Sequence, residues 1–311
     1  MAARQRQSVA PAASSESQMT YSRFMQMFPD NDACLEYLRQ KFYPDGSACP
    51  SCGKVTKFHR IKSRASYSCQ YCRHQVFPTS GTIFHKSTTS LQLWFWAIFL
   101  MSSTRCGISA KQLEREIGVS YPTAHRMFKQ IRSLLSDDDG APLAGEVEMD
   151  ETYYGGKPRA GDKMSRQERW EKKVPVWAAV ERGGQVRAKV VPHMSIPLIR
   201  PHVRKFVLPD AMVFTDEATL YDSLHREGYR HKRIKHRAQV YVDGDVTTNA
   251  IEGFFGLFKN GIRGVYHAVS EKHLQSYVDE YAFRYNRRND RQPIFFAILD
   301  RVVKEPLLAA E

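Results

Sequence analysis

Four cysteines near the start of the chain have the spacing of a metal site. Cys49 and Cys52 form one Cys-x2-Cys pair, and Cys69 and Cys72 form a second pair after an interval of sixteen residues. Tetrahedral structural zinc sites use two such pairs, each held in a tight turn. Ordinary buried or disulfide-linked cysteines are the alternative, but we expect a reducing compartment, because the N-terminus has no signal-peptide pattern. The spacing therefore predicts one structural Zn²⁺ ion.

Three acidic residues that lie far apart along the chain could hold catalytic metal ions. Asp150 ends an apparent strand within the segment EVEMDETYY, and Asp216 follows the strand-like segment AMVFT. Side chains at strand ends of an α/β sheet reach into a crevice. Glu252 lies in a helical segment, 247–264, and a helical wheel places it at the half-buried edge of the apolar stripe. Such carboxylates can converge on two Mg²⁺ ions, the arrangement that supports phosphoryl transfer.

Neighbouring residues leave alternatives to this triad. Isolated acids at strand ends are often helix caps or solvated side chains, and Glu148, Glu151 and Glu217 compete as ligands. Lys259 falls on the same side of its helix as Glu252, two turns further along. It could pair with Glu252 as a structural feature, or it could hold a DNA backbone beside the metal ions.

The balance of charges points to a polyanionic partner. Lys and Arg outnumber Asp and Glu by 46 to 33, which gives a formal net charge of +13. The longest apolar run, LWFWAIFLM, is too short to span a bilayer, so we expect a soluble cytoplasmic protein that binds DNA and no membrane. A solvated positive surface is the alternative for each basic cluster. The residues expected to bind DNA phosphates are Lys57, Arg60, Lys62, Arg64, Arg73, Arg233, Lys235, Arg237, Arg263, Arg287 and Arg288.

A helix-turn-helix pattern follows the cysteine-rich segment. Ser109 is a candidate N-cap, Gly118 falls at a turn, and Ser120 precedes a second helix with Pro122 in its first turn. An ordinary helical hairpin would show the same outline. Beside a basic zinc ribbon, the pattern favours a DNA-binding unit. Its second helix would present Ser120, Tyr121, Thr123, Arg126 and Lys129 to a major groove.

The changes in composition divide the chain into successive segments. We expect a disordered tail at 1–18, a helical segment at 19–45, a zinc ribbon at 46–86, a helix-turn-helix domain at 87–137, a linker at 138–145, an α/β domain at 146–300 and a tail at 301–311. Within the α/β domain the pattern predicts strands between 146 and 192, with a hairpin turn at Arg182-Gly183-Gly184. Helices are expected at 196–207, 217–227, 247–264 and 270–287, and further strands at 211–216 and 232–242.

Several motifs, taken in this order, resemble one family. The segments CPSC, CQYC, LQLWFWAIFLM, MDETYYGGK, FTDEATLYDSL and TTNAIEGFFGLFKNGIRG are similar to those of bacterial insertion-sequence transposases, the ISXO2-like group, which carry an N-terminal zinc ribbon and are related to eukaryotic Merlin elements. The similarity runs from about residue 20 to residue 300. It implies a ribonuclease H-like catalytic domain, which is a mixed sheet flanked by helices, preceded by a zinc ribbon and an all-α helix-turn-helix domain.

The resemblance also implies roles for individual residues. Asp150 and Asp216 match the first two acids of the family, and Lys259 matches its trailing basic residue. Members of the family use either Glu or Asn as the third ligand, so Glu252 and Asn249 both remain candidates. The implied cofactors are two catalytic Mg²⁺ or Mn²⁺ ions.

The expected function is that of a DNA transposase. The implied partners are the terminal inverted repeats of the element, target DNA and at least one second copy of the chain, in a bacterial cytoplasm at the nucleoid. A DNA-binding regulator with an inactive C-terminal domain is one alternative. A structure-selective nuclease of the same fold is another.

Overall fold

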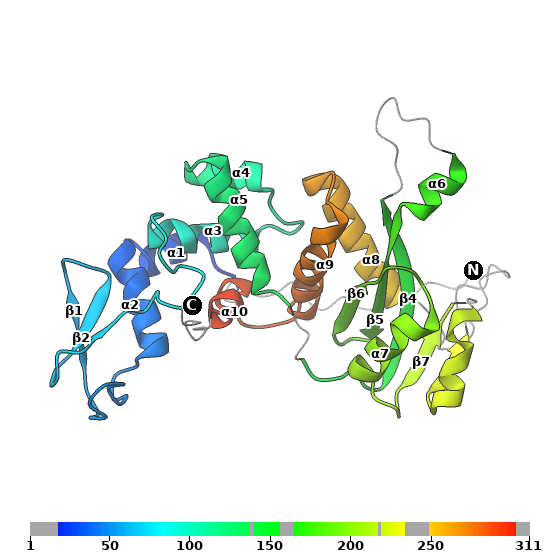
Figure 1. Cartoon of the computed structure of the whole chain (residues 1–311), viewed down its shortest axis with the longest axis horizontal. Helices are drawn as coiled ribbons and strands as arrows, with labels where there is room; N and C mark the ends of the chain where they lie inside the picture. Colours follow the sequence, from blue (N-terminus) through cyan, green and yellow to red (C-terminus); the bar gives the residue numbers. More distant parts are fainter. Residues whose placement is uncertain (1–17, 137–139, 156–164, 217–218, 234–248, 303–311) are drawn as a thin grey trace, which may run out of the picture. The chain divides into compact units, whose positions relative to one another are not determined.

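The chain folds into two compact units, each described here by itself (Figure 1). The first unit comprises Met1–Leu134 with Asn289–Glu311, and the second comprises Leu135–Arg288. The computed structural model describes residues 18–136, 140–155, 165–216, 219–233 and 249–302. The predicted tails, 1–18 and 301–311, lie almost wholly outside these residues, as does the start of the predicted linker.

The first unit combines a small antiparallel sheet with helices. Its strands follow the order β1-β2-β3. The elements are α1 (Tyr21–Met27), α2 (Asn31–Phe42), β1 (Phe58–Ile61), β2 (Ser66–Cys69), β3 (Gln75–Val76), α3 (Leu91–Ser103), α4 (Ala110–Ile117), α5 (Tyr121–Ser133) and α10 (Ile294–Asp300). The helical segment expected at 19–45 is two helices, because Asp30 caps a new helix through a 2.8 Å hydrogen bond from the Ala33 amide.

Helix α10 packs in the first unit, which differs from the sequence expectation of one domain over 146–300. Phe295 of α10 is fully buried, and its ring lies 5.9 Å from that of Phe24 and 5.7 Å from that of Phe28. Lys41 of α2 also donates a 2.5 Å hydrogen bond to the carbonyl of Leu299. The apolar face of α10 therefore finds its core among the N-terminal helices, a long-range choice that local composition does not encode.

The second unit is built on a five-stranded mixed sheet with the order β6-β5-β4-β7-β8. Its strands are β4 (Glu146–Gly155), β5 (Lys173–Glu181), β6 (Val186–Val190), β7 (Met212–Thr215) and β8 (Arg230–Arg233). Strands β6, β5 and β4 are antiparallel, whereas β4, β7 and β8 are parallel. The predicted hairpin turn joins β5 to β6 and has Gly183 at φ 72°, a conformation that favours glycine.

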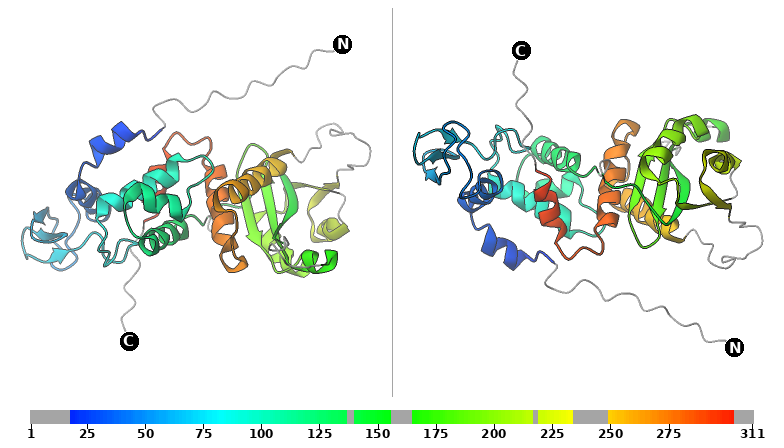
Figure 2. Two further views of the ribbon diagram at one scale, coloured as in Figure 1. Left: turned by 90° about the horizontal axis from the view of Figure 1, so that it is seen from above. Right: turned by 90° about the horizontal axis from the view of Figure 1, so that it is seen from below.

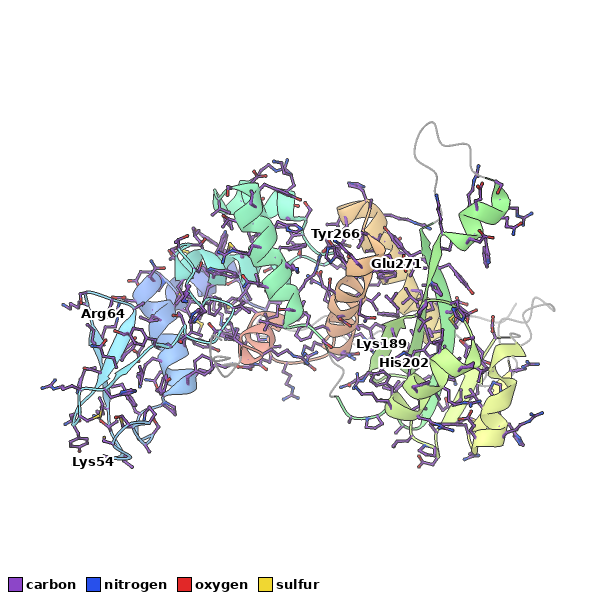
Figure 3. The ribbon with its side chains drawn as sticks, in the orientation of Figure 1. Lys54, Arg64, Lys189, His202, Tyr266 and Glu271 are labelled. Atoms are coloured by element: carbon purple, nitrogen blue, oxygen red, sulfur yellow. The ribbon has the colours of Figure 1, made fainter. Side chains whose placement is uncertain are left out.

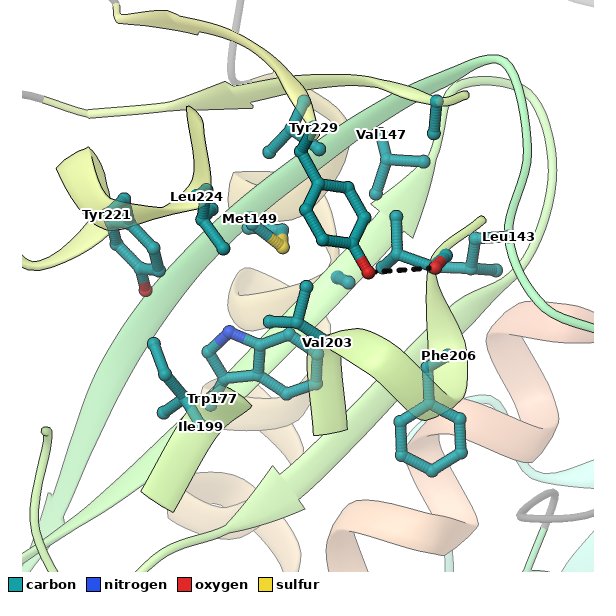
Figure 4. Close-up of a cluster of buried hydrophobic side chains, with 14 residues drawn as sticks. Leu143, Val147, Met149, Trp177, Ile199, Val203, Phe206, Tyr221, Leu224 and Tyr229 are labelled. Carbon is teal, nitrogen blue, oxygen red and sulfur yellow. Dashed lines mark hydrogen bonds between the residues drawn. The ribbon is translucent and has the colours of Figure 1, made fainter. Parts of the chain in front are cut away.

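Helices cover both faces of this sheet (Figure 2). They are α7 (Ile196–Phe206), a 3₁₀ helix, η2 (Thr219–Glu227), α8 (Asn249–Gly261), a π-helical turn, η4 (Ile262–Tyr266), and α9 (Glu271–Asn286), whereas the short helix α6 (Arg166–Glu171) has no buried residue. One core lies between the sheet and α7 with η2, and Figure 4 shows Met149 of β4 and Trp177 of β5 within it. The other core lies between β5, β6, α8 and α9. Because side chains alternate along a strand, Glu148 and Asp150 of β4 face the α8 side.

The apolar stripe of α8 is confirmed as a core-facing surface. Ile251, Phe254, Phe255, Phe258 and Ile262 are all buried, as the helical spacing predicts. The helix expected at 270–287 is confirmed as α9, and a Cβ at Gly261 of α8 would overlap the Tyr281 side chain of α9. Among the helices that the structure describes, none combines the length and the apolar character of a membrane span.

Candidate functional site

The four predicted zinc ligands come together in the first unit. Their sulfur atoms all lie within 4.8 Å of one another. Cys49 Sγ is 3.7 Å from Cys72 Sγ, and Cys52 Sγ is 3.9 Å from Cys69 Sγ. A tetrahedral ion with Zn–S bonds of about 2.3 Å sets its sulfurs about 3.8 Å apart. The spacing and chemistry of these donors therefore fit one zinc ion.

Tight turns of the backbone shape this cysteine cluster. The amide of Gly53 donates to the carbonyl of Cys49 over 2.9 Å, and the amide of Arg73 donates to that of Cys69 over 3.2 Å. Both turn residues have positive φ, 68° at Gly53 and 62° at Arg73. Since Arg73 closes the second turn, its backbone has a structural role, although its side chain is exposed.

Hydrogen bonds prepare one of these thiols for metal binding. Burial opposes ionisation of Cys69, but hydrogen bonds from the backbone at Cys72 and Tyr71 and from the Thr56 side chain lower its pKa to about 6. Zinc binds the thiolate form. Cys69 therefore favours the thiolate, whereas the pKa of Cys52 in the same cluster is raised to about 11.

Asp150 lies in β4, and Asp216 directly follows the neighbouring strand β7. The parallel register of β4 and β7 sets Glu148 opposite Phe214. Continued by two residues, this register would bring Asp150 beside Asp216, and adjacent strands are about 4.8 Å apart. Both carboxylates are half-buried. Two interior strands of the sheet therefore direct acids from distant parts of the sequence toward one another.

Burial and neighbouring acids both disfavour ionisation of Asp150. The pKa of Asp150 is raised to about 7, chiefly by burial, and further by the charges of Asp216, Glu151 and Glu252. The amide of Glu151 acts in the opposite sense, because it donates a 2.7 Å hydrogen bond to Asp150 Oδ1. Among the described residues, only the cysteines form a group whose ligand atoms all lie within 4.8 Å. The oxygen atoms of the carboxylates are thus further apart than the sulfur atoms of the cysteines.

Glu252 is exposed, so the prediction that it is half-buried was wrong. A helical wheel gives the direction in which a side chain points. It does not show whether neighbouring elements cover that side chain. Asn249, the competing third ligand, is exposed at the first residue of α8. Lys259 is half-buried, and its Nζ lies 5.8 Å from the centre of the Phe255 ring.

Glu148, which the sequence suggested as a competing ligand, instead anchors helix α8. This buried carboxylate accepts hydrogen bonds from the amides of Ala250 at 2.9 Å and Ile251 at 3.0 Å. It also accepts a 2.9 Å bond from Arg182 Nε. A negative charge at a helix N-terminus is favourable because it satisfies unpaired amides and the helix dipole. Glu148 thereby fixes the first turn of α8, which carries Glu252.

The other two competitors are also accounted for. Glu151 faces the opposite side of the sheet, where its Oε2 accepts a 2.9 Å hydrogen bond from the Tyr221 hydroxyl. Burial raises the pKa of Glu151, and the charge of Asp216 adds to that effect. Glu217 lies outside the residues that the structure describes.

Comparison with known proteins identifies the family. Residues 142–286 match the ISXO2-like transposase domain, and residues 29–75 match the transposase zinc-ribbon domain. A Halobacterium salinarum protein, "Uncharacterized protein in transposable element ISH50", is 30% identical over 274 residues, which cover 82% of this chain and 90% of the relative. The chain belongs to the ISXO2-like transposase family. Its mixed sheet with flanking helices is the ribonuclease H-like fold of that family, as predicted.

The chain has weaker similarity to other proteins. A Haemophilus influenzae protein, "Uncharacterized transposase-like protein", is 27% identical over 124 residues, which cover 40% of this chain and 98% of the relative. A solved structure of the Mos1 transposase paired-end complex with left transposon end is 16% identical, covers 63% of this chain and 75% of that chain, and has a TM-score of 0.28. A simian T-cell lymphotropic virus intasome in complex with PP2A regulatory subunit B56 gamma is 11% identical, with 55% and 67% coverage and a TM-score of 0.31. TM-scores below 0.5 are too low to support inferences about this transposase family member.

The basic side chains expected on the zinc ribbon are mostly exposed. Lys57, Lys62 and Arg64 are exposed, and Figure 3 shows Arg64 and Lys54 at opposite ends of the β1–β2 region. Arg60 is different, because its Nη2 donates a 2.7 Å bond to Asp32 and its Nη1 bonds backbone carbonyls. Arg60 therefore joins the ribbon to α2, which sequence reasoning missed because Asp32 is distant in the chain.

Helices α4 and α5 have the predicted caps and turn. The Ser109 hydroxyl accepts a 3.1 Å bond from the Gln112 amide, and Gly118 ends α4 at φ 68°. Ser120 precedes α5, and its hydroxyl lies 3.1 Å from that of Thr123. The side chains of α5 divide into a buried and an outer set. Of the predicted DNA contacts, Ser120, Tyr121, Arg126 and Lys129 are exposed and Thr123 is half-buried.

The basic residues of the second unit differ in their surroundings. Arg233 and Arg263 are exposed. Arg287 packs 3.8 Å from the Phe283 ring, and the exposed Arg288 donates a 2.9 Å bond to the Gly184 carbonyl. Contacts within the second unit thus restrain the side chains of these two arginines. Lys235 and Arg237 lie outside the described residues.

Proposed function

We propose that the protein is a metal-dependent DNA transposase whose catalytic acids are Asp150, Asp216 and Glu252. The observation that carries the proposal is the parallel register of β4 and β7, which directs Asp150 and Asp216 toward one another; burial, and then the charges of Asp216, Glu151 and Glu252, raise the pKa of Asp150. Carboxylates that repel one another in this way gain most when a shared cation neutralises them. Two Mg²⁺ or Mn²⁺ ions, when bound, activate the attacking oxygen and stabilise the leaving oxygen of a phosphodiester.

The substrate is DNA at the ends of the element. Water attacks a phosphodiester there, and the freed 3′-OH then attacks target DNA at the same site. The side chains of Asp150 and Asp216 are presented from neighbouring strands, while Glu148 and Arg182 hold the helix that carries Glu252. Rigid elements of this kind give the positional accuracy that phosphoryl transfer requires.

Glu252 is a better third ligand than Asn249. A carboxylate carries the charge that a hard cation prefers, and the charge of Glu252 already acts on Asp150. Lys259 lies two turns along the same helix, where its ammonium group would contact the DNA backbone. Asn249 remains the competing ligand.

The first unit would bind the DNA ends. The cysteine cluster holds one zinc ion, which stabilises a ribbon whose exposed cations contact phosphates. Helices α4 and α5 act as a helix-turn-helix, with the outer side chains of α5 in the major groove. Because transposition joins two element ends, the active assembly is at least a homodimer, and its place is the bacterial cytoplasm at the nucleoid.

A divalent-ion-dependent cleavage assay on the DNA that flanks the reading frame tests this function. Asp150→Asn and Asp216→Asn should abolish cleavage and leave DNA binding intact, because they remove ligands without changing the fold. Glu151→Gln is the matched control, since its hydrogen bond with Tyr221 lies on the opposite face. A regulator with an inactive domain would show no cleavage by any variant. A nuclease would cut DNA but fail to join pre-cleaved ends to a target.

A further inference from the structure

A basic cavity of about 820 Å³ lies at the end of strand β4 in the second unit. It is bordered by β4, α6 and Arg263 of the η4 turn, and α6 lies beyond the end of β4 (Figure 1). Its cationic lining residues are Arg166, Arg169, Lys173 and Arg263. Among the described residues that line it, none is acidic. A cavity of this size can hold a ligand of nucleotide dimensions.

An exposed tryptophan gives this cavity an aromatic wall. Trp170 is 57% exposed, whereas Trp94 and Trp177 are fully buried in the cores. The Trp170 ring packs 5.0 Å from that of Tyr153, at an interplanar angle of 36°. An exposed indole beside a second aromatic ring and several cations provides a surface on which a planar, negatively charged ligand can stack.

The charges around Trp170 suit a nucleotide better than an apolar ligand. Lys173 Nζ lies 4.2 Å from the centre of the Trp170 ring. Stacking of a DNA base on an aromatic ring is stronger than an exposed cation–π contact of this kind. A base can therefore take the place of the ammonium group, which then becomes available to an adjoining phosphate.

The cavity is close to the proposed catalytic acids. Tyr153 lies three residues after Asp150 on the same strand, about 10 Å along it at 3.3 Å per residue, and its side chain leaves the opposite face of the sheet from that of Asp150, so the entering strand would pass around the end of β4. Burial raises the pKa of Tyr153, and the charges of Glu151 and Asp150 add to that rise. A distance of about 10 Å corresponds to about three nucleotides of one strand of duplex DNA, or fewer if the strand is extended.

We propose that this cavity binds an unstacked base of the DNA strand that enters the catalytic site. The base stacks on Trp170, and the flanking phosphates contact Arg166, Arg169, Lys173 and Arg263. This inference rests on the proposed function and adds to it a contact with single-stranded rather than paired DNA. Such a contact would hold a strand whose end has separated from its complement, close to the acids that act on it.

Photo-cross-linking of the full chain to a single-stranded oligonucleotide that carries one 5-iodouracil tests the proposal. We expect the cross-link within residues 165–173. Trp170→Ala should lower its yield and weaken binding of the oligonucleotide about tenfold. Trp170→Phe should keep most of the binding, because a stacking surface remains. An abasic oligonucleotide should bind the unmodified protein as weakly as the normal one binds Trp170→Ala.

A charge-matched control separates this cavity from general attraction to DNA. Lys173→Gln should weaken binding more than Lys205→Gln, which removes a lysine that also lies over an aromatic ring, 5.1 Å from that of Phe206 on α7. Equal binding of normal and abasic oligonucleotides, or an unchanged Trp170→Ala variant, would overturn the proposal. Asp150→Asn should still cross-link. Cross-linking in a protein that never cleaves DNA would refute the proposed catalysis alone, and cleavage without cross-linking would refute the cavity alone.

Discussion

Replacing Asp150 by Asn should stabilise the metal-free second unit at alkaline pH. The pKa of Asp150 is raised from 3.8 to about 7 by burial and by the charges of Asp216, Glu151 and Glu252. A rise of about 3 pKa units opposes ionisation by at most about 4 kcal/mol. The folded state holds this proton more tightly than the unfolded state does. The free energy of unfolding therefore decreases as the pH rises from about 4 to about 7. Above about pH 7 the folded state bears the full cost of ionising Asp150. Asn carries no charge, so the variant does not bear this cost.

Thermal unfolding in buffer free of magnesium and manganese measures this effect. For a domain of this size, about 4 kcal/mol corresponds to a rise in Tm of about 10 °C. Asp150→Asn should gain this much at pH 8 and less than half of it at pH 5. Added Mg²⁺ should then stabilise the unmodified protein and not the variant, because only the unmodified protein has the Asp150 carboxylate that binds the ion. Asp210→Asn, a change at an exposed acid before β7, is the control and should leave Tm unchanged.

An equal or lower Tm for Asp150→Asn at pH 8 would contradict this reasoning. That result would mean that the ionised carboxylate is not opposed by its neighbours. Stabilisation of the variant by Mg²⁺, to the same degree as the unmodified protein, would show that the ion binds elsewhere.

Three further predictions concern the anchor of α8, the third ligand and the zinc site. Glu148→Gln should cost about 1.5–3 kcal/mol of stability and lower cleavage, because it weakens the charged hydrogen bond with Arg182 and removes the charge at the start of α8. Glu146→Gln, which loses only an exposed pair with Arg182, should cost less than about 1 kcal/mol in the same denaturation experiment. Glu252→Gln should abolish cleavage while Asn249→Ala retains it, and the opposite result would assign the ligand to Asn249. Cys72→Ser should lower the zinc content, measured by mass spectrometry, and weaken DNA binding without changing the unfolding of the second unit.

Local patterns in the sequence were enough to predict several parts of the molecule. The Phe-rich stripe of α8 follows from helical periodicity, and the cysteine cluster follows from two short spacings, since in both cases the partners are determined by neighbouring residues. The strands that carry Asp150 and Asp216 were also predicted. Their closeness depends on the parallel register of β4 and β7, which neither segment encodes alone.

Other features depend on long-range partners and could not be predicted. Glu148 caps amides that lie 102 and 103 residues later in the chain. Phe295 finds its aromatic neighbours in α1 and α3. Trp170 lies in a segment whose composition gives no sign that its ring stays exposed. In each case the amino acid limits the possible partners, and the tertiary fold selects one.

Anomalous diffraction from crystals grown with Mn²⁺ tests the central claim most directly. The account predicts manganese peaks within about 2.5 Å of carboxylate oxygens of Asp150 and Asp216, with Glu252 completing the site. Manganese bound away from these residues, with Asp150 and Asp216 in separate surroundings, would contradict it.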